Sequence, residues 1–347
     1  MAQEWPQTWD LTSLYTEPND FRLVEDIARA RDHAPGWQSA RRRAWGYLFL
    51  LSASGACDDA ARSDVVRQMA DLQDGVTVTG PIGRFIAGWR QDQAQGLPHP
   101  LARAAIAGGL DWRALVSARL ELQILVRELL LLPLARNRQQ LAWDDCVDLV
   151  LKSARNAAER QVGMDLVGGR HVDILTRPGK PSRPFCLAPD PAVDPFISMQ
   201  ARGDLQDALV LTHELQHAID EIGLGTPPEP LAAEMNARHA ERHVLSTVAT
   251  TFGAESAIAL VLVRQGSELI EPLRTLILQI EAAEELDATG YATSSPAHSA
   301  AFAIPPLYPA YHILSYLAAF ADLPLPPKTA ALYGQIVMLF ERIKVAG

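Results

Sequence analysis

The sequence predicts a mainly α fold, in which a small β-hairpin or sheet lies beside one particular helix. Apolar residues recur at helical spacing through most of the chain, and alternating apolar residues appear only between about 167 and 199. Proline and glycine gather in a few short stretches, with no repeat or low-complexity linker. A chain of 347 residues can bury one large core or two lobes, and we expect one continuous body.

The first half of the chain predicts helices joined by short loops. Asp144 and Asp145 open the last of these helices, where acidic side chains suit the positive end of the helix dipole. The apolar spacing predicts these helices over residues 20–31, 37–53, 59–72, 101–107, 111–132 and 144–162.

The pattern changes after Asp165. Residues 167–169 form a Gly-containing turn, and residues 171–175 alternate as a short strand does. The Pro-rich segment 177–195 excludes a long helix, and residues 195–199 predict a second strand. Beyond it, helical spacing predicts helices over 204–222, 231–251, 255–287, 308–321 and 329–345, with loops at 223–230 and 289–306.

Composition narrows the class of protein. The net charge of -10 argues against a nucleic-acid or anionic-membrane partner, and no apolar stretch is long enough to span a bilayer. Cys57, Cys146 and Cys186 are widely spaced and form no C-x-x-C pair, which favours a reducing compartment. The first residues lack the features of a signal peptide. We therefore expect a cytoplasmic protein.

The run His213-Glu214-Leu215-Gln216-His217 is an H-E-x-x-H motif, which is typical of zinc peptidases. On a helix, residues four apart share a face, so both imidazoles can reach one cation. Glu214 projects at a different angle and can hold a water beside the cation. The alternative is a pair of core histidines satisfied by hydrogen bonds, but buried polar groups in so apolar a helix need partners or a metal.

A catalytic zinc site needs a third protein ligand. We predict Glu234, which small apolar residues precede. Glu241 follows two turns later on the same face and can orient a ligand histidine, or it is a solvated charge. His239 lies off that face. Asp220, about one turn after His217, either orients an imidazole or is solvated near the helix end.

Four segments together resemble the oligoendopeptidase F and thimet-oligopeptidase family of zinc metallopeptidases. The likeness is best over about 177–241 and thin over 20–165. The opening Trp9-Asp10-Leu11-Thr12-Ser13-Leu14-Tyr15 resembles that of the oligoendopeptidases. The other segments are Gly179–Cys186 with Pro195–Met199, then Gly203–His217, then Glu234–Glu241.

This resemblance implies a helical, gluzincin-like fold that encloses a channel and holds one Zn²⁺ per chain. It implies a scaffold over 1–165, a catalytic zinc-binding region over 166–347, and short or unstructured peptides as substrates. His213, His217 and Glu234 would hold the zinc, a zinc-bound water would be the nucleophile, and Glu214 would be the general base. Residues 196–199 or 171–175 would align the peptide as an added strand.

The sequence also departs from the family. Relatives are considerably longer and have a longer loop after the second ligand; they usually carry Gly at 216 and often His at 220. Residues 304–316 resemble the segment whose His and Tyr bind the oxyanion, but Pro306 and Leu314 stand at two of those positions. We predict that Tyr308, Tyr311 or His298 supplies the missing donor. His312 and Tyr316 are further candidates, and all of these could be ordinary helix or loop residues.

Three functions therefore stay open. The first is a zinc endopeptidase or oligopeptidase, which the intact Glu214 favours because a pure binder needs no general base. The second is a weakly active or inactive peptidase-like binding or regulatory protein, which the altered donors and shortened scaffold favour. The third is a maturation protease dedicated to one peptide. The sequence does not fix the oligomeric state.

Overall fold

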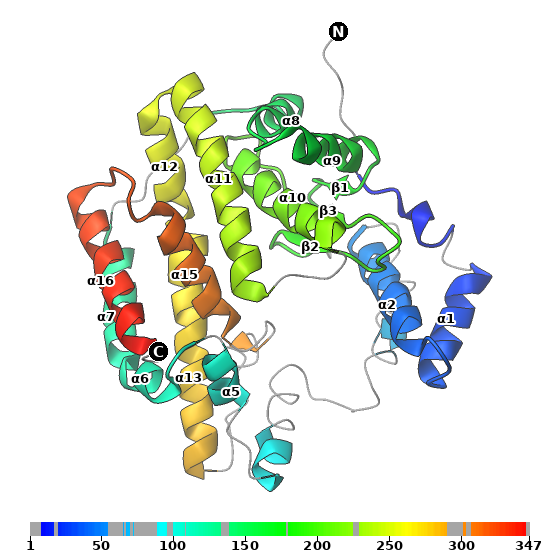
Figure 1. Cartoon of the computed structure of the whole chain (residues 1–347), viewed down its shortest axis with the longest axis horizontal. Coiled ribbons are helices and arrows are strands. Elements are labelled where there is room, and N and C mark those ends of the chain that lie inside the picture. The colour runs from blue at the N-terminus through cyan, green and yellow to red at the C-terminus, as the bar shows by residue number, and fades with distance from the viewer. Residues whose placement is uncertain are drawn as a thin grey trace. The chain divides into compact units, whose positions relative to one another are not determined.

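The computed structural model confirms the predicted class: helices make up most of the described chain, together with one three-stranded sheet (Figure 1). The structure describes residues 8–16, 20–54, 65, 67–69, 72, 89–95, 100–107, 109–132, 139–177, 180–224, 229–289, 301–302 and 307–344. Most of the predicted helix over 59–72, residues 225–228 of the predicted loop over 223–230, most of the predicted loop over 289–306, and His298 fall outside these residues.

Contacts divide the chain into two units, each built from several segments. Residues 1–76, 138–228 and 239–251 form the first unit, and residues 77–137, 229–238 and 252–347 form the second. The helix α11 (Pro230–Phe252) is continuous and contributes to both. The division into a scaffold and a catalytic region at residue 165 is a functional one, and it stays a prediction.

The first unit begins with the 3₁₀ turn η1 (Leu11–Ser13) and the paired helices α1 (Phe21–Arg31) and α2 (Trp37–Ser54). α1 starts one residue later than predicted, because Asp20 caps the helix: its carboxylate accepts from the Arg22 N–H. Between the two helices, the Tyr15 hydroxyl donates to Asp26 at 2.7 Å, and Arg43 bridges Asp26 and Asp190.

The sheet has the order β1-β3-β2, with β1 (Val172–Asp173) parallel and β2 (Phe185–Leu187) antiparallel to β3 (Phe196–Ser198). The sequence predicted β1 and β3 but missed β2, because three extended residues among prolines give no periodicity. The prediction that residues 196–199 offer a free edge is wrong, since β3 is paired on both sides. The edges are β1 and β2.

A buried lysine ties the ends of β1 and β3 together. The Lys180 ammonium donates to the carbonyls of Asp173 at 2.9 Å, Leu175 at 3.0 Å and Met199 at 2.6 Å. It also pairs with the Asp173 carboxylate at 3.3 Å, and both side chains are fully buried. Burial lowers the pKa of Lys180, whereas the charge of Asp173 opposes that shift.

Replacing Lys180 with Met should destabilise the first unit by about 3–5 kcal/mol, because three carbonyls lose a charged donor and the buried Asp173 loses one charged partner while it keeps another, Arg177. Urea unfolding followed by circular dichroism measures this loss. The exposed Lys328 provides a matched control, and Lys328→Met should change stability by less than about 0.5 kcal/mol. Equal stabilities of the two variants would contradict the assignment.

Helices α8 (Trp143–Lys152), α9 (Ala157–Gly168) and α10 (Gln206–Leu224) pack together behind the sheet strands β2 and β3. The single helix predicted over 144–162 is therefore wrong. Ser153 ends α8, with its hydroxyl bonded to the Leu149 carbonyl, and the Asn156 side chain caps α9 by accepting from the Glu159 N–H at 3.0 Å.

The second unit contains α5 (Pro100–Ala107), α6 (Trp112–Ser117), α7 (Arg119–Leu130), α12 (Ala254–Gln265), α13 (Glu271–Thr289), α15 (Tyr308–Phe320) and α16 (Pro327–Ile343). The helix predicted over 111–132 is interrupted at Ala118, where ψ is -4°. The helix predicted over 255–287 is interrupted by a π-helical turn, η2 (Gly266–Ile270). Pro272 lies two residues after η2, and a proline has no N–H to donate to the carbonyl four residues earlier, that of Glu268 in η2. No proline lies near Ala118, so the apolar spacing does not reveal that interruption.

Among the helices that the structure describes, none combines the length and the apolar character that crossing a lipid bilayer requires.

Candidate metal centre

The helix that carries the H-E-x-x-H motif begins at a turn stabilised by a buried carboxylate. Asp207 accepts the backbone N–H groups of Arg202 and Gly203 at 2.8–3.0 Å. Burial raises the pKa of Asp207, and these backbone donors oppose that shift. Gly203 has φ of +74°, a conformation that favours glycine at this turn. From this turn, α10 runs through a core that holds His213 and Glu214, each 7% exposed.

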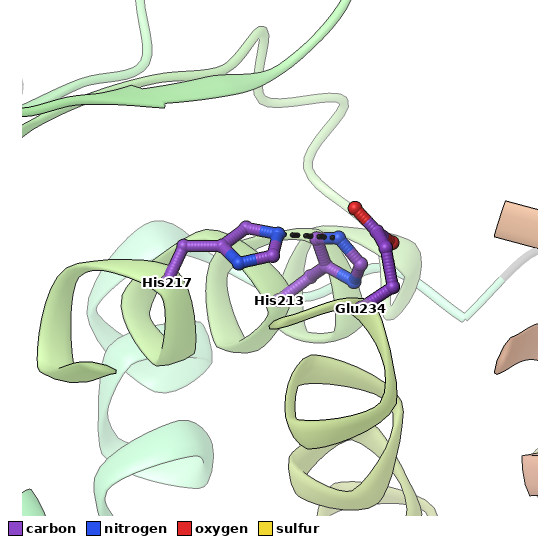
Figure 2. Close-up of side chains that lie close together, drawn as sticks. All are labelled: His213, His217 and Glu234. Carbon is purple, nitrogen blue, oxygen red and sulfur yellow. Dashed lines mark hydrogen bonds between the residues drawn. The ribbon is translucent and has the colours of Figure 1, made fainter. Parts of the chain in front are cut away.

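The two histidines of the motif face one another. The Nε2 atoms of His213 and His217 are 3.1 Å apart, and the rings are nearly perpendicular, at 85° (Figure 2). Two imidazole nitrogens on one tetrahedral zinc ion lie about 3.3 Å apart, given Zn–N bonds of about 2.0–2.1 Å. The predicted i, i+4 arrangement therefore presents both nitrogens at a spacing that suits a shared cation.

Glu234 lies on α11, and the middle of this helix is held by the contact of Glu241 with His213. Because seven residues of a continuous helix span about two turns, Glu234 lies on the same side of α11 as Glu241. One ligand atom from each of His213, His217 and Glu234 lies within 4.8 Å of the others (Figure 2). The structure thus brings together the three residues that the sequence predicted as metal ligands.

Glu241 makes the contact predicted for a residue that orients a ligand. Its Oε1 atom is 2.8 Å from His213 Nδ1, and the Glu241 carboxylate is 1% exposed. Because an ionised carboxylate only accepts, Nδ1 carries the hydrogen and the Nε2 lone pair points toward His217. This is the tautomer that a zinc ligand needs.

The donor set fits zinc. It combines two imidazoles with one carboxylate, which is the ligand set of many hydrolytic zinc enzymes. Glu214, Glu234 and Glu241 are all at least 93% buried, and buried carboxylates at one place are costly without compensating positive charge. A divalent cation would supply part of that charge. His213, His217 and Glu234 would hold it, and Glu241 would orient His213.

Removing the Glu241 carboxylate should weaken zinc binding without removing a ligand. Glu241→Gln should lower the zinc affinity by about 10–100-fold, because His213 loses the acceptor that fixes its tautomer. Competition with a chromophoric chelator measures the affinity. Glu255→Gln, at an exposed acid near the start of α12, is the control and should bind zinc as the wild type does. Wild-type zinc affinity in both Glu241→Gln and Glu255→Gln would contradict this role for Glu241.

Glu214 lies toward the sheet. The helix α10 packs against β2, and burial, followed by the charge of Glu214, raises the pKa of the Cys186 thiol on β2. The general-base candidate therefore faces the edge strand rather than the α8 and α9 side of α10.

Asp220 accepts a hydrogen bond from the Gln216 side-chain amide at 2.7 Å, and Oε1 of that same amide accepts from Arg155 at 2.9 Å. These contacts link three side chains along α10 and the start of α9. Asp220 thus contacts Gln216 of the same helix. The predicted role of Asp220 in orienting an imidazole stays a prediction.

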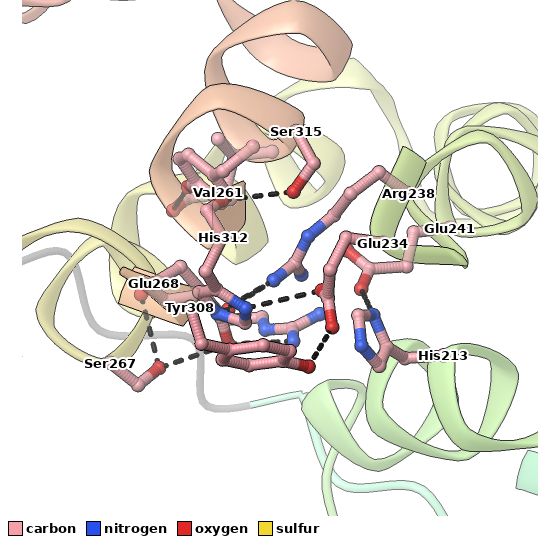
Figure 3. Close-up of polar contacts among 12 residues, drawn as sticks. His213, Glu234, Arg238, Glu241, Val261, Ser267, Glu268, Tyr308, His312 and Ser315 are labelled. Carbon is pink, nitrogen blue, oxygen red and sulfur yellow. Dashed lines mark hydrogen bonds and ion pairs between the residues drawn. The ribbon is translucent and has the colours of Figure 1, made fainter. Parts of the chain in front are cut away.

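The predicted oxyanion donors differ in their contacts. The Tyr308 hydroxyl donates to Glu234 Oε1, which brings Tyr308 to the ligand set (Figure 3). Tyr311 instead donates to the Ala104 carbonyl of α5 at 3.2 Å, and Tyr316 donates to the Val261 carbonyl at 2.9 Å. His298 lies outside the described residues.

Sequence reasoning missed a charged cluster next to Glu234. It consists of Arg238, Arg264, Glu268 and His312, and we call it the Glu268 cluster. Burial raises the pKa of Glu268, but the charges of Arg238 and Arg264 outweigh it and hold that pKa well below its usual range. One signal was available: Arg264 and Glu268 are i, i+4 charges inside an apolar helical stretch.

No family profile matches this sequence, and no curated protein is similar to it. A solved structure of a "putative peptidase" from Chlamydophila abortus aligns with 98% of this chain and 56% of its own, at 14% identity and a TM-score of 0.37. This chain thus spans a little over half the length of that protein. At this level the likeness is too weak to support an inference.

Proposed function

We propose that this protein is a zinc metallopeptidase that hydrolyses short or unstructured peptides. The observation that carries the proposal is the convergence of His213, His217 and Glu234, whose ligand atoms lie within 4.8 Å of one another, directly beside Glu214 in an H-E-x-x-H motif. The substrate class follows from the resemblance to the oligoendopeptidases.

Each residue then has a role. His213, His217 and Glu234 would bind one zinc ion, which when bound lowers the pKa of water toward about 7 and polarises a carbonyl. Glu214 would accept the proton of the attacking water and pass it to the leaving amine. Tyr308, whose hydroxyl contacts Glu234, is the described tyrosine best placed to stabilise the oxyanion once that contact is exchanged.

The edge strand β2 offers a way to align the peptide. Its antiparallel partner β3 occupies one side, and β2 contacts α10. A peptide that adds to the other side of β2 would run past the helix that carries Glu214. This assigns to residues 185–187 the role that the sequence gave to 196–199 or 171–175.

The first test is to measure metal and cleavage on the same preparation. Protein purified without chelator should contain about one zinc per chain by mass spectrometry. It should cleave an unstructured peptide library, lose that activity with a chelator, and regain it with added zinc. Absence of stoichiometric metal would overturn the zinc site, and zinc without cleavage would leave only the binding role.

One observation favours that second candidate, a peptide-binding protein without activity. All three described tyrosines that the sequence proposed as donors already donate elsewhere: Tyr308 to Glu234, Tyr311 to Ala104 and Tyr316 to Val261. Loss of an oxyanion donor costs about 10²–10³ in rate. The cleavage assay separates the two candidates, because a binder would retain peptide without producing fragments.

A further inference from the structure

His312 lies between two carboxylates, and neither contact belongs to the chemistry proposed above. Its Nδ1 atom is 3.1 Å from Glu234 Oε2, and its Nε2 atom is 2.6 Å from Glu268 Oε2 (Figure 3). The side chain is 20% exposed. Both ring nitrogens of His312, which the sequence made a candidate oxyanion donor, are thus engaged with carboxylates.

His312 donates the hydrogen bond to Glu234 whether its ring is doubly protonated or neutral. If His312 is doubly protonated, both nitrogens donate. If it is neutral, Nε2 can accept from Arg238 Nη2, which is 2.9 Å away, and the hydrogen stays on Nδ1. In both cases Nδ1–H donates to Glu234 Oε2. Together with Tyr308 on Oε1, it leaves each oxygen of Glu234 with a hydrogen-bond donor.

The other three residues of the Glu268 cluster, Glu268, Arg238 and Arg264, hold His312 in place, and we call them its anchor. Glu268 accepts from Arg238 on Oε2 and from Arg264 on Oε1, the latter at 2.7 Å. All three side chains are at most 9% exposed. Buried charges with several partners do not reorient easily, because any new position would leave one of them unpaired.

Two further features of the structure support this anchor. Glu268 lies in the π-helical turn η2, and such turns within α-helices are frequent at functional sites. The Arg238 guanidinium lies over the Tyr316 ring at 5.5 Å from its centroid, and Tyr316 is tied to the Val261 carbonyl. The anchor and its support therefore come from α11, α12, η2 and α15 of one unit.

We propose that His312 is a positioning residue that sets the orientation of the Glu234 carboxylate for metal binding, and that Glu268 with Arg238 and Arg264 holds His312 in place. This inference rests on the zinc site proposed above. It predicts that zinc affinity depends on the hydrogen bond that His312, which does not itself bind the metal, donates to the ligand Glu234. Such dependence is common where a carboxylate binds a metal.

Two isosteric substitutions separate the contacts of the ring. The amide nitrogen of Asn lies near the position of His Nδ1, whereas that of Gln lies near Nε2. His312→Asn should therefore keep the donor to Glu234, although it loses the contact with Glu268, and bind zinc more tightly than His312→Gln does. His312→Gln should keep the contact with Glu268, lose the one with Glu234, and bind zinc about 10–100-fold more weakly.

The measurements are zinc affinity by chelator competition and the visible absorption of the cobalt(II)-loaded protein, which reports ligand geometry. Thermal unfolding of the metal-free variants controls for folding. If a His312 variant does not fold, Glu268→Gln provides a second test, with an affinity loss expected because His312 loses its charged partner.

The outcomes are distinguishable. Weaker binding and an altered cobalt spectrum in His312→Gln, with tighter binding in His312→Asn, support the inference. Wild-type affinity in both variants, or equal losses in both, overturns it while the zinc site stands. A wild-type protein that binds no zinc overturns the proposed function and this inference with it.

Discussion

Glu214→Gln should reduce peptide cleavage by about 10²–10⁴-fold and leave about one zinc per chain. Glutamine has nearly the shape of glutamate but cannot accept the proton of the attacking water. Glu214 stands between the two histidines in the sequence and is 7% exposed in the structure. Its charge acts on the Cys186 thiol of β2. Its removal should therefore affect proton transfer and not the metal ligands. Single-turnover cleavage of a quenched fluorescent peptide measures the change.

Glu221→Gln is the matched control for this experiment. Glu221 lies on the same helix, seven residues further on, and pairs with Arg42 at 2.9 Å where both side chains are partly exposed. Such a pair contributes at most about 1 kcal/mol, so cleavage should change little. If Glu214→Gln cleaved as fast as Glu221→Gln, Glu214 could not be the general base.

Glu234→Gln should lower the zinc affinity by more than the 10–100-fold expected for residues that only orient a ligand. The substitution removes the anionic ligand, and a neutral amide oxygen binds zinc far less strongly. The amide can still contact Tyr308 and His312, so the second unit should keep its fold. Chelator competition gives the affinity, and circular dichroism checks the fold.

Glu229→Gln, at an exposed residue just before α11, controls for the loss of one negative charge. Equal zinc affinities of the Glu229 and Glu234 variants would mean that Glu234 is not a ligand. In that case Glu241, the other buried acid on this helix, would be the next candidate for the third position.

Periodicity located the long helices because their apolar faces repeat along the sequence. α1, α2, α10, α11 and α15 begin within two residues of their predicted starts. It failed where a local backbone detail decides the outcome. The caps at Ser153 and Asn156 divide one predicted helix, and the π-helical turn η2 divides another. Such details change one or two dihedral angles and leave the apolar spacing almost intact.

The sheet shows a second limit. A strand of three residues is too short to show alternation, so β2 was missed inside its Pro-rich segment. The order of the strands depends on pairing between residues that are distant in sequence. Only that pairing shows that β3 is central and that β2 is an edge next to α10.

At the candidate metal centre, the sequence by itself determined what helical spacing can determine. His213 and His217 share a face because they are four residues apart, and Glu234 and Glu241 share a face because they are seven apart. The 2.8 Å contact of Glu241 with His213 was foreseeable for the same reason. Only the tertiary structure decided which side chains surround Glu234. Tyr308 and His312 contact it from α15, 74 and 78 residues further along the chain, and Glu268 contacts His312 from η2. No periodicity in the sequence indicates contacts between residues so far apart.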